Sequence, residues 1–235
     1  MIPTTTSTGN ASLSSATRSP VSRATTSLLG CGVVVGPLYV VTSLVQASTR
    51  EGFDLGRHQW SLLMNGELGW VQITNVVLCG VMVVAFALGL RRALTGGRGA
   101  RWAPRLIAVF GGSLIAAAIF RADPALGFPV GTPQGPGTVS WHGLLHIAAG
   151  GIGFSCFAAA CFVLARRYAV EGRRGWAVFS RFAGVALLGG FAMVGSGQGS
   201  VASNLVFTGT VVLVWAWMSA VAVDRYRDLG LVTIG

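Results

Sequence analysis

Long apolar stretches separated by short polar segments form the dominant pattern along this chain. A helix needs roughly 20 apolar residues to cross a bilayer core about 30 Å thick. Backbone groups in lipid must pair internally, and the alternation typical of a membrane barrel strand is absent, so the stretches predict helices. There are six such stretches, of which the fifth is the weakest and could begin nearer Val178. They cover Ser27–Val45, Gly69–Leu90, Ala103–Phe120, Trp141–Ala165, Phe182–Gly195 and Leu205–Val223.

The pattern predicts an all-α fold, a polytopic membrane bundle of six transmembrane helices within residues 27–223. Residues 1–26 are rich in Ser and Thr and poor in large apolar residues, so we expect a disordered leader. Residues 224–235 are expected to form a short tail. Cleavage of the first helix is an alternative, because its end, Val45-Gln46-Ala47, fits a signal-peptidase site. The leader is unusually long for a signal sequence, which favours retention of the helix.

The composition excludes a water-soluble globule. Hydrophobic residues make up 52% of the 235 residues and charged residues only 10%, with a mean hydropathy of +0.66. A soluble domain carries roughly 25% charged residues. The few charges are unbalanced, because 17 basic residues, all of them arginine, stand against 7 acidic ones.

The arginines fall mainly on one side of the predicted membrane. Fourteen of the 17 lie in the two terminal segments and in the connections after the second and fourth stretches. The positive-inside rule then predicts a multi-pass protein of the plasma membrane with both termini in the cytoplasm. The other side carries three arginines and four acids, a net charge of 3 − 4 = −1. The basic excess therefore does not indicate nucleic-acid binding, and the expected partner is the lipid bilayer.

The side with few arginines holds the residues that could perform chemistry. All three histidines and four of the seven acids belong to it. Acids and histidines at one mouth of a helical bundle can carry out general acid–base catalysis. Candidate catalytic residues are the acids Asp54, Glu67 and Asp123 and the bases His58 and His146. Candidate binding residues are Arg50, Arg57, Ser61, Asn75 and Arg121.

Two further features border this candidate site. Gln72, Thr74 and Asn75 lie a turn or two inside the second helix. They could extend the site inward or, as is commoner, hydrogen-bond one helix to another. The segment Pro124–Ser140 is rich in Pro and Gly and is too long for a minimal helix connection. Because proline limits loop entropy, this segment could cap the mouth of the bundle; the alternative is an exposed linker.

The spacing of two histidines raises the possibility of a zinc ion as cofactor. His142 and His146 are four residues apart, so both rings lie on one face of a helix, as in zinc-binding H-E-x-x-H helices. No glutamate lies between them, and a third ligand would have to come from His58, Asp54 or Asp123. A hydrogen-bonded network of His with Asp or Glu is the main alternative, and proton-transfer catalysis is a third.

At these residues the sequence resembles an uncharacterised bacterial and archaeal integral membrane family, catalogued as domain of unknown function nine-nine-eight. The resemblance covers about Leu28 to Val223 and implies six helices without an established activity. It also implies that the residues chosen above on charge grounds are hallmark positions of the family. The matching pieces are Arg50-x-Gly52-x-Asp54 with His58 and Ser61, Gly69-Trp70 with Asn75, Ala122-Asp123-Pro124, and Gly143-x-x-His146.

The sequence supports two classes of function. The first is a membrane-embedded site that binds or processes a lipid or isoprenoid-like small molecule, through metal-assisted hydrolysis or through proton-initiated isomerisation or cyclisation. The second is a non-catalytic binding, transport, assembly or sensor protein with the same cluster of residues. Transport is the weaker alternative, because no charged residue lies deep within a predicted helix.

Overall fold

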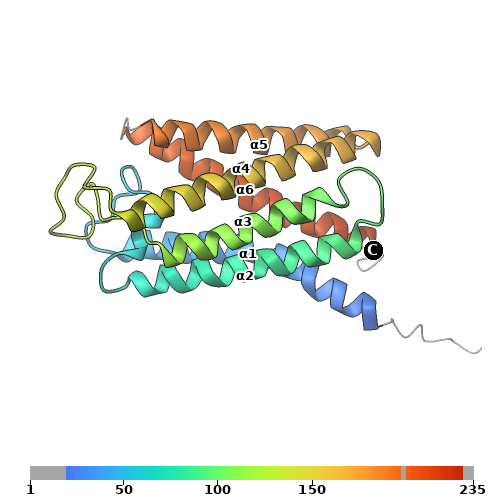
Figure 1. The fold of residues 1–235 in the computed structure, drawn as a ribbon, viewed down its shortest axis with the longest axis horizontal. Coiled ribbons are helices and arrows are strands. Elements are labelled where there is room, and N and C mark those ends of the chain that lie inside the picture. Colours follow the sequence, from blue (N-terminus) through green and yellow to red (C-terminus); the bar gives the residue numbers. More distant parts are fainter. Residues whose placement is uncertain (1–19, 197–199, 230–235) are drawn as a thin grey trace, which may run out of the picture.

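The computed structural model describes residues 20–196 and 200–229, which form six long helices and one short 3₁₀ helix (Figure 1). All six long helices are long and apolar enough to cross a membrane, so the prediction of a six-helix membrane fold is confirmed. No strand occurs within the described ranges. The elements are α1 (Pro20–Thr49), η1 (Trp60–Met64), α2 (Gly69–Ala93), α3 (Trp102–Ile119), α4 (Trp141–Val170), α5 (Arg174–Gly195) and α6 (Val201–Asp228).

Five of the six long helices extend beyond their apolar stretches, and α1, α5 and α6 do so the most. Helix α5 begins at Arg174 rather than Phe182, and α1 begins at Pro20 rather than Ser27. Residues 20–26 are therefore helical and not part of a disordered leader, while residues 1–19 lie outside the described part. Helix α6 continues to Asp228, so the predicted tail is helical over residues 224–228. Backbone hydrogen bonding along a helix does not stop where polar side chains begin, so hydropathy underestimates helix length.

The six helices pack in chain order into a closed ring. Each helix contacts the next one along the chain, and α6 closes the ring against α1. The connections after α2 and α4 are short and those after α1 and α3 are longer, and sequential helices run antiparallel, as in other bundles (Figure 1). A ring of six helices encloses more space than a four-helix bundle, and its interior must be filled by side chains or remain a cavity.

The closing contact between α1 and α6 depends on a small residue. A Cβ atom on Gly36 would lie 2.8 Å from Ser219 Oγ and 2.9 Å from Trp215 O, so no larger residue fits there. The Ser219 hydroxyl donates to the Val33 carbonyl across the same contact (3.1 Å). Small residues and interhelical hydrogen bonds are the usual means of helix association in lipid. Because α1 lies between α2 and α6, cleavage of this helix would open the ring.

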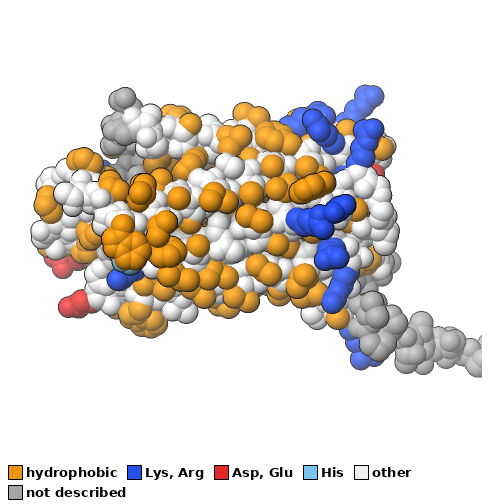
Figure 2. All heavy atoms as spheres, in the orientation of Figure 1, with side chains coloured by type: hydrophobic (Ala, Val, Ile, Leu, Met, Phe, Trp, Pro, Cys, Tyr) orange, Lys and Arg blue, Asp and Glu red, His pale blue; other side chains and the backbone are white. Residues whose placement is uncertain are grey.

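The two ends of the ring differ in charge. Arginines gather at the end formed by the α2–α3 and α4–α5 connections, where α1 begins and α6 ends (Figures 1 and 2). We call this the arginine-rich end and the opposite one the cavity end. Large apolar side chains fill the interior of the ring toward the arginine-rich end, among them Phe86, Leu90, Ile107, Leu164, Tyr168, Trp217 and Met218.

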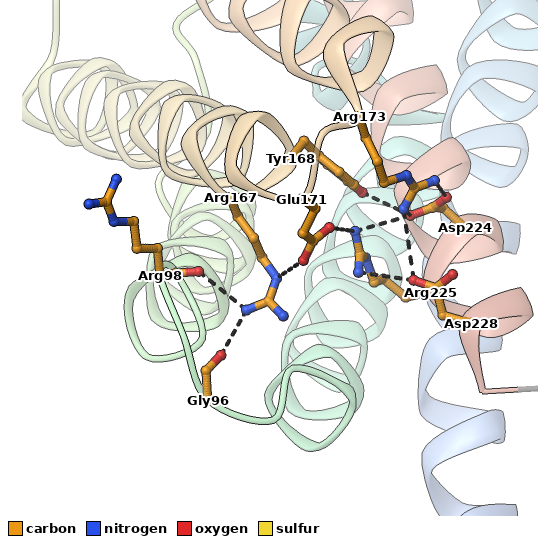
Figure 3. Close-up of polar contacts among 9 residues, drawn as sticks. All are labelled: Gly96, Arg98, Arg167, Tyr168, Glu171, Arg173, Asp224, Arg225 and Asp228. Atoms are coloured by element: carbon orange, nitrogen blue, oxygen red, sulfur yellow. Dashed lines mark hydrogen bonds and ion pairs between the residues drawn. The ribbon is translucent and has the colours of Figure 1, made fainter.

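An ion-pair network ties three segments together at the arginine-rich end (Figure 3). Arg173, from the α4–α5 connection, pairs with Asp224 of α6, which also accepts a hydrogen bond from Tyr168 Oη at 3.1 Å. The hydrogen bond that Arg173 itself donates to Asp224 raises the pKa of Arg173. Arg225 lies 3.3 Å from Glu171 and 3.0 Å from Asp228. All three acids at this end are therefore paired with arginine.

The same network reaches the connection between α2 and α3. Arg167 forms an ion pair with Glu171 at 2.6 Å and donates to the carbonyls of Gly96 (2.8 Å) and Arg98 (3.3 Å). The network thus connects the end of α4, the end of α6 and the α2–α3 connection. Its residues were not predicted to interact, because the sequence analysis treated this end only as a signal of orientation.

We expect Asp224→Asn to lower stability strongly, because Asp224 is buried (7% side-chain exposure) and faces both Arg173 and Arg225. Removing one partner of a buried ion pair costs about 3–5 kcal/mol. Thermal unfolding of the purified protein in detergent measures the effect. Asp228→Asn is the matched control, because Asp228 is 51% exposed and its loss should cost less than about 1 kcal/mol. Equal unfolding temperatures for the two variants would contradict the structural role of Asp224.

Candidate functional site

A cavity of about 500 Å³ occupies the interior of the ring toward the cavity end. This volume falls within the range of roughly 300–1,000 Å³ that is typical of small-molecule sites. All six long helices and η1 contribute to its wall. Near the midpoints of the helices, its deep part is lined by aromatic rings, namely Phe110, Phe154, Phe157, Phe207 and Trp215. The cavity is therefore mainly apolar, and its polar groups lie toward the mouth.

His146 is the candidate base that the structure places on the cavity wall. Its Nδ1 lies 3.0 Å from both the Ala117 carbonyl and the Phe120 carbonyl at the end of α3. A carbonyl can only accept, so Nδ1 carries the proton, and a neutral ring then has its lone pair on Nε2. Nε2 has no hydrogen-bond partner within the described residues. His146 thus offers a free acceptor, on a ring whose orientation is set by two backbone carbonyls.

Asp123 also borders the cavity, and its carboxylate is held by the start of α4. Oδ2 accepts from the backbone N–H of Ser140 at 2.7 Å, and Oδ1 accepts from the Ser140 hydroxyl at 2.6 Å. Ser140 is the N-cap of α4, where its Oγ accepts from the Gly143 N–H at 3.1 Å. A negative charge at a helix N-terminus is favourable. Asp123 therefore anchors α4, and a Cβ on Gly143 would overlap its carboxylate.

His58 fastens two loops rather than facing the cavity. Its Nδ1 accepts from the Asp54 N–H at 2.9 Å, and its Nε2 donates to the Leu126 carbonyl at 3.0 Å. Both ring nitrogens are occupied, and only 2% of the residue is exposed. The Asp54 carboxylate accepts from the Gly56 N–H at 2.7 Å within its own turn. These contacts favour a structural role for both residues.

The two candidate binding arginines of the first loop also hold backbone in place. Arg50 donates to the carbonyls of Leu63 (3.0 Å) and Asn65 (2.6 Å), and its guanidinium lies 5.1 Å from the centre of the Phe128 ring. Partial burial lowers the pKa of Arg50. Arg57 donates to Gln134 Oε1 at 3.1 Å. Both side chains are used to connect the loops of the cavity end.

The segment Pro124–Ser140 forms a cap over the mouth, as one of the two interpretations of its sequence predicted. Phe128 is 1% exposed and packs against Trp60 and Leu63 of η1. Backbone hydrogen bonds cross the segment from Leu126 N to Gly135 O (2.8 Å) and from Gly127 N to Pro133 O (3.0 Å). Five residues of the cap reach the cavity wall: Ala125, Leu126, Pro136, Thr138 and Val139.

The ligands proposed for zinc do not come together. His142 stacks on Trp141, with ring centroids 3.5 Å apart, while Nδ1 of His146 is occupied by the α3 carbonyls. Within residues 20–196 and 200–229, no group of three or more His, Cys, Asp or Glu side chains could hold a metal ion. Spacing places two side chains on one helical face, but their neighbours decide where they point. The zinc interpretation is therefore not supported by the arrangement of these side chains.

The remaining candidates divide between the cavity and its surroundings. Ser61 lines the cavity. Asn75 is buried between α1 and α2, where its Nδ2 donates to the Tyr39 carbonyl and Gln72 Oε1, both at 3.3 Å. It thus bonds helix to helix, the commoner of the two expected roles. Glu67 and Arg121 are exposed and have no ion-pair partner in the described part of the chain.

Sequence reasoning missed most of the cavity lining, including two aromatic residues that carry polar atoms. Tyr39 of α1 and Trp60 of η1 both line the wall, with ring centroids 5.8 Å apart. The Tyr39 hydroxyl has no hydrogen-bond partner among the described residues, and Trp60 Nε1 is buried without an acceptor there. Both residues resemble ordinary apolar packing or interface aromatics in sequence, so no local signal distinguishes them.

Replacing the Asp123 carboxylate tests its anchoring role. Asp123→Ala leaves the N–H and hydroxyl of Ser140 without their acceptor, so we expect the free energy of unfolding to fall by about 1–3 kcal/mol. Glu67→Ala is the control, because this exposed acid should change it by less than about 0.5 kcal/mol. Thermal unfolding in detergent measures both. Wild-type stability of Asp123→Ala would contradict the anchoring role.

Comparison with known proteins places the chain in a family. A family described as "Protein of unknown function (DUF998)" matches residues 33–224, which include parts of all six long helices, the cap and both cavity residues His146 and Asp123. Neither the curated proteins nor the solved structures contain a match. The match spans most of the chain and agrees with the resemblance carried by the Asp-Pro and histidine positions. The protein is thus a multi-pass membrane protein that belongs to the DUF998 family.

Proposed function

We propose that this protein binds an apolar, lipid or isoprenoid-like small molecule in the central cavity. The observation that carries the proposal is a partly open cavity of about 500 Å³ whose deep part is aromatic and whose mouth is polar. Ligand pockets combine an apolar lining with a few placed polar groups in this way. A molecule from the bilayer has the apolar body that such a lining accommodates.

Acid–base processing of the bound molecule is a second candidate, and it is favoured by one observation. Nε2 of His146 is free on the cavity wall, while Nδ1 is held by two carbonyls. A histidine oriented through one nitrogen can transfer a proton at the other. The acids offer less support, because Asp123 and Asp54 accept hydrogen bonds from their own surroundings and Glu67 is exposed and does not line the cavity. We therefore favour binding of the molecule over its chemical conversion.

The proposed orientation places the arginine-rich end in the cytoplasm and the cavity mouth on the opposite face of the plasma membrane. The concentration of arginine at one end supports this orientation (Figure 2). The cavity mouth would then open to the extracytoplasmic side. A ligand would reach the site from that surface or from the adjoining lipid leaflet.

Cysteine labelling tests the orientation. Glu51 and Thr95 are exposed residues at the cavity end and the arginine-rich end respectively. A membrane-impermeant maleimide applied to intact cells should label Glu51→Cys and leave Thr95→Cys unlabelled until the cells are opened. The wild type serves as the blank, because its four cysteines lie within helices. Labelling of Thr95→Cys alone in intact cells would reverse the orientation.

Filling the cavity tests the binding function. Gly150 lines the cavity, and a Cβ there would meet no atom within 4 Å, so Gly150→Phe should place its ring in empty space. Gly189→Phe is the matched control, because Gly189 is equally open and is absent from the cavity wall. Lipids extracted from the purified proteins are compared by mass spectrometry. We expect wild type and Gly189→Phe to retain the same apolar species, and Gly150→Phe to retain roughly tenfold less.

Equal retention by all three proteins would contradict the proposal. A loss in both variants would also contradict it, because it would show that the bound lipid covers the outer surface rather than the cavity. Thermal unfolding of each variant confirms that its fold is retained before the comparison is made.

A further inference from the structure

We infer that the ligand of the cavity carries an uncharged hydroxyl group at its polar end and donates it to Nε2 of His146. The ligand class is then a neutral apolar alcohol, such as a long-chain, isoprenoid or ring alcohol, rather than a phosphate, carboxylate or amine. This inference rests on the proposed function, since it assigns the head group of the molecule that the cavity holds.

The charges of the cavity wall exclude an anionic head group. No arginine or lysine of the described residues lines the cavity. Arg50 and Arg57 are occupied by carbonyl and amide oxygens, Arg121 is exposed beside the lining residue Ala122, and all three side chains lie outside the lining. A phosphate or carboxylate would therefore be buried without a positive partner, which costs several kcal/mol.

A cationic head group is disfavoured by the same wall. Asp123 is the one acid that lines the cavity, and both of its oxygens already accept from Ser140 at 2.6–2.7 Å. Its charge is further compensated by the N-terminus of α4. A bound ammonium would have to compete with these donors for Asp123. Asp123, whose carboxylate is the one formal charge of the lining, is thus already engaged by these donors.

The free hydrogen-bonding groups complement a hydroxyl. Because Nδ1 of His146 donates to Ala117 O and Phe120 O, the neutral ring can only accept at Nε2, so its ligand must be a donor. An alcohol is the simplest uncharged apolar molecule with such a donor. Its oxygen can in turn accept a hydrogen bond, and the Ser61 hydroxyl on the wall is a possible donor without a partner in the described part of the chain.

Tryptophan fluorescence provides the test, because Trp60 and Trp215 line the cavity. The probes are stearyl alcohol brominated at mid-chain, its sulfate ester and the corresponding stearylamine, added to the purified protein in detergent at neutral pH. Bromine quenches a nearby indole, so occupancy of the cavity appears as saturable quenching. We expect the alcohol to bind about tenfold more tightly than either charged probe. The Gly150→Phe variant should lose the saturable component.

The variant His146→Asn removes the acceptor at Nε2 while it keeps the hydrogen bonds by which the side chain contacts α3. The Asn amide N–H occupies a position similar to that of Nδ1 and preserves the tie to the α3 carbonyls, while the acceptor at Nε2 is lost. We expect alcohol affinity to fall about fivefold to tenfold, with little change for the charged probes. The head-group preference of the wild type is measured independently, so the test does not depend on this variant folding.

The outcomes separate the inference from the proposed function. Tighter binding of the sulfate ester or the amine than of the alcohol overturns the inference and leaves an apolar binding site in place. An alcohol affinity unchanged in folded His146→Asn also overturns it. If no probe quenches saturably, or if quenching is the same in Gly150→Phe, the proposed binding function itself fails.

Discussion

The lack of water in the hydrocarbon core is the constraint on which the rest of this structure depends. Every backbone N–H and C=O within the membrane must be paired inside the protein, so the chain crosses as helices, and the packing of those helices decides everything else. Here each helix packs against its neighbours in chain order, and α6 returns to α1. Such a ring has an interior of its own. The arginine-rich end fills it with side chains, and the cavity end leaves it open.

Polar residues have different structural roles at the two ends of the ring. At the arginine-rich end, ion pairs such as Arg173–Asp224 connect elements whose loops are short and whose core is full. At the cavity end, single side chains hold backbone groups of long loops, as His58 does for Leu126 and Arg50 does for Leu63. The loops must be fixed there because they form the wall and cap of an open space. The polar residues of the cavity end are therefore mostly the frame of the site, and His146, whose Nε2 is free, is one exception.

Sequence reasoning recovered the parts of this molecule that depend on local composition. The six helices follow from apolar stretches, and the cap follows from the length and proline content of Pro124–Ser140. Asp123, His146 and Ser61, chosen as candidates from the sequence, all line the cavity, whereas the zinc interpretation of His142 and His146 was not supported. The zinc interpretation failed because contacts between side chains and other elements orient the two rings. The α3 carbonyls accept a hydrogen bond from His146, and His142 stacks on Trp141. The ion pair between Glu171 and Arg225 and the cavity position of Tyr39 arise only when distant helices meet.

The tautomer of His146 links this architecture to the chemistry that the cavity can support. The end of α3 leaves carbonyls without helical partners, and two of them are satisfied by the proton on Nδ1. Helix termination in α3 therefore fixes an acceptor at Nε2 on the wall of an apolar space. The hydrogen-bonded Asp123 carries the one formal charge of this lining, and no arginine or lysine of the described residues contributes to it. A site of this kind selects its ligand by one directed hydrogen bond and by shape, which is why the identity of the head group is the most informative property to measure.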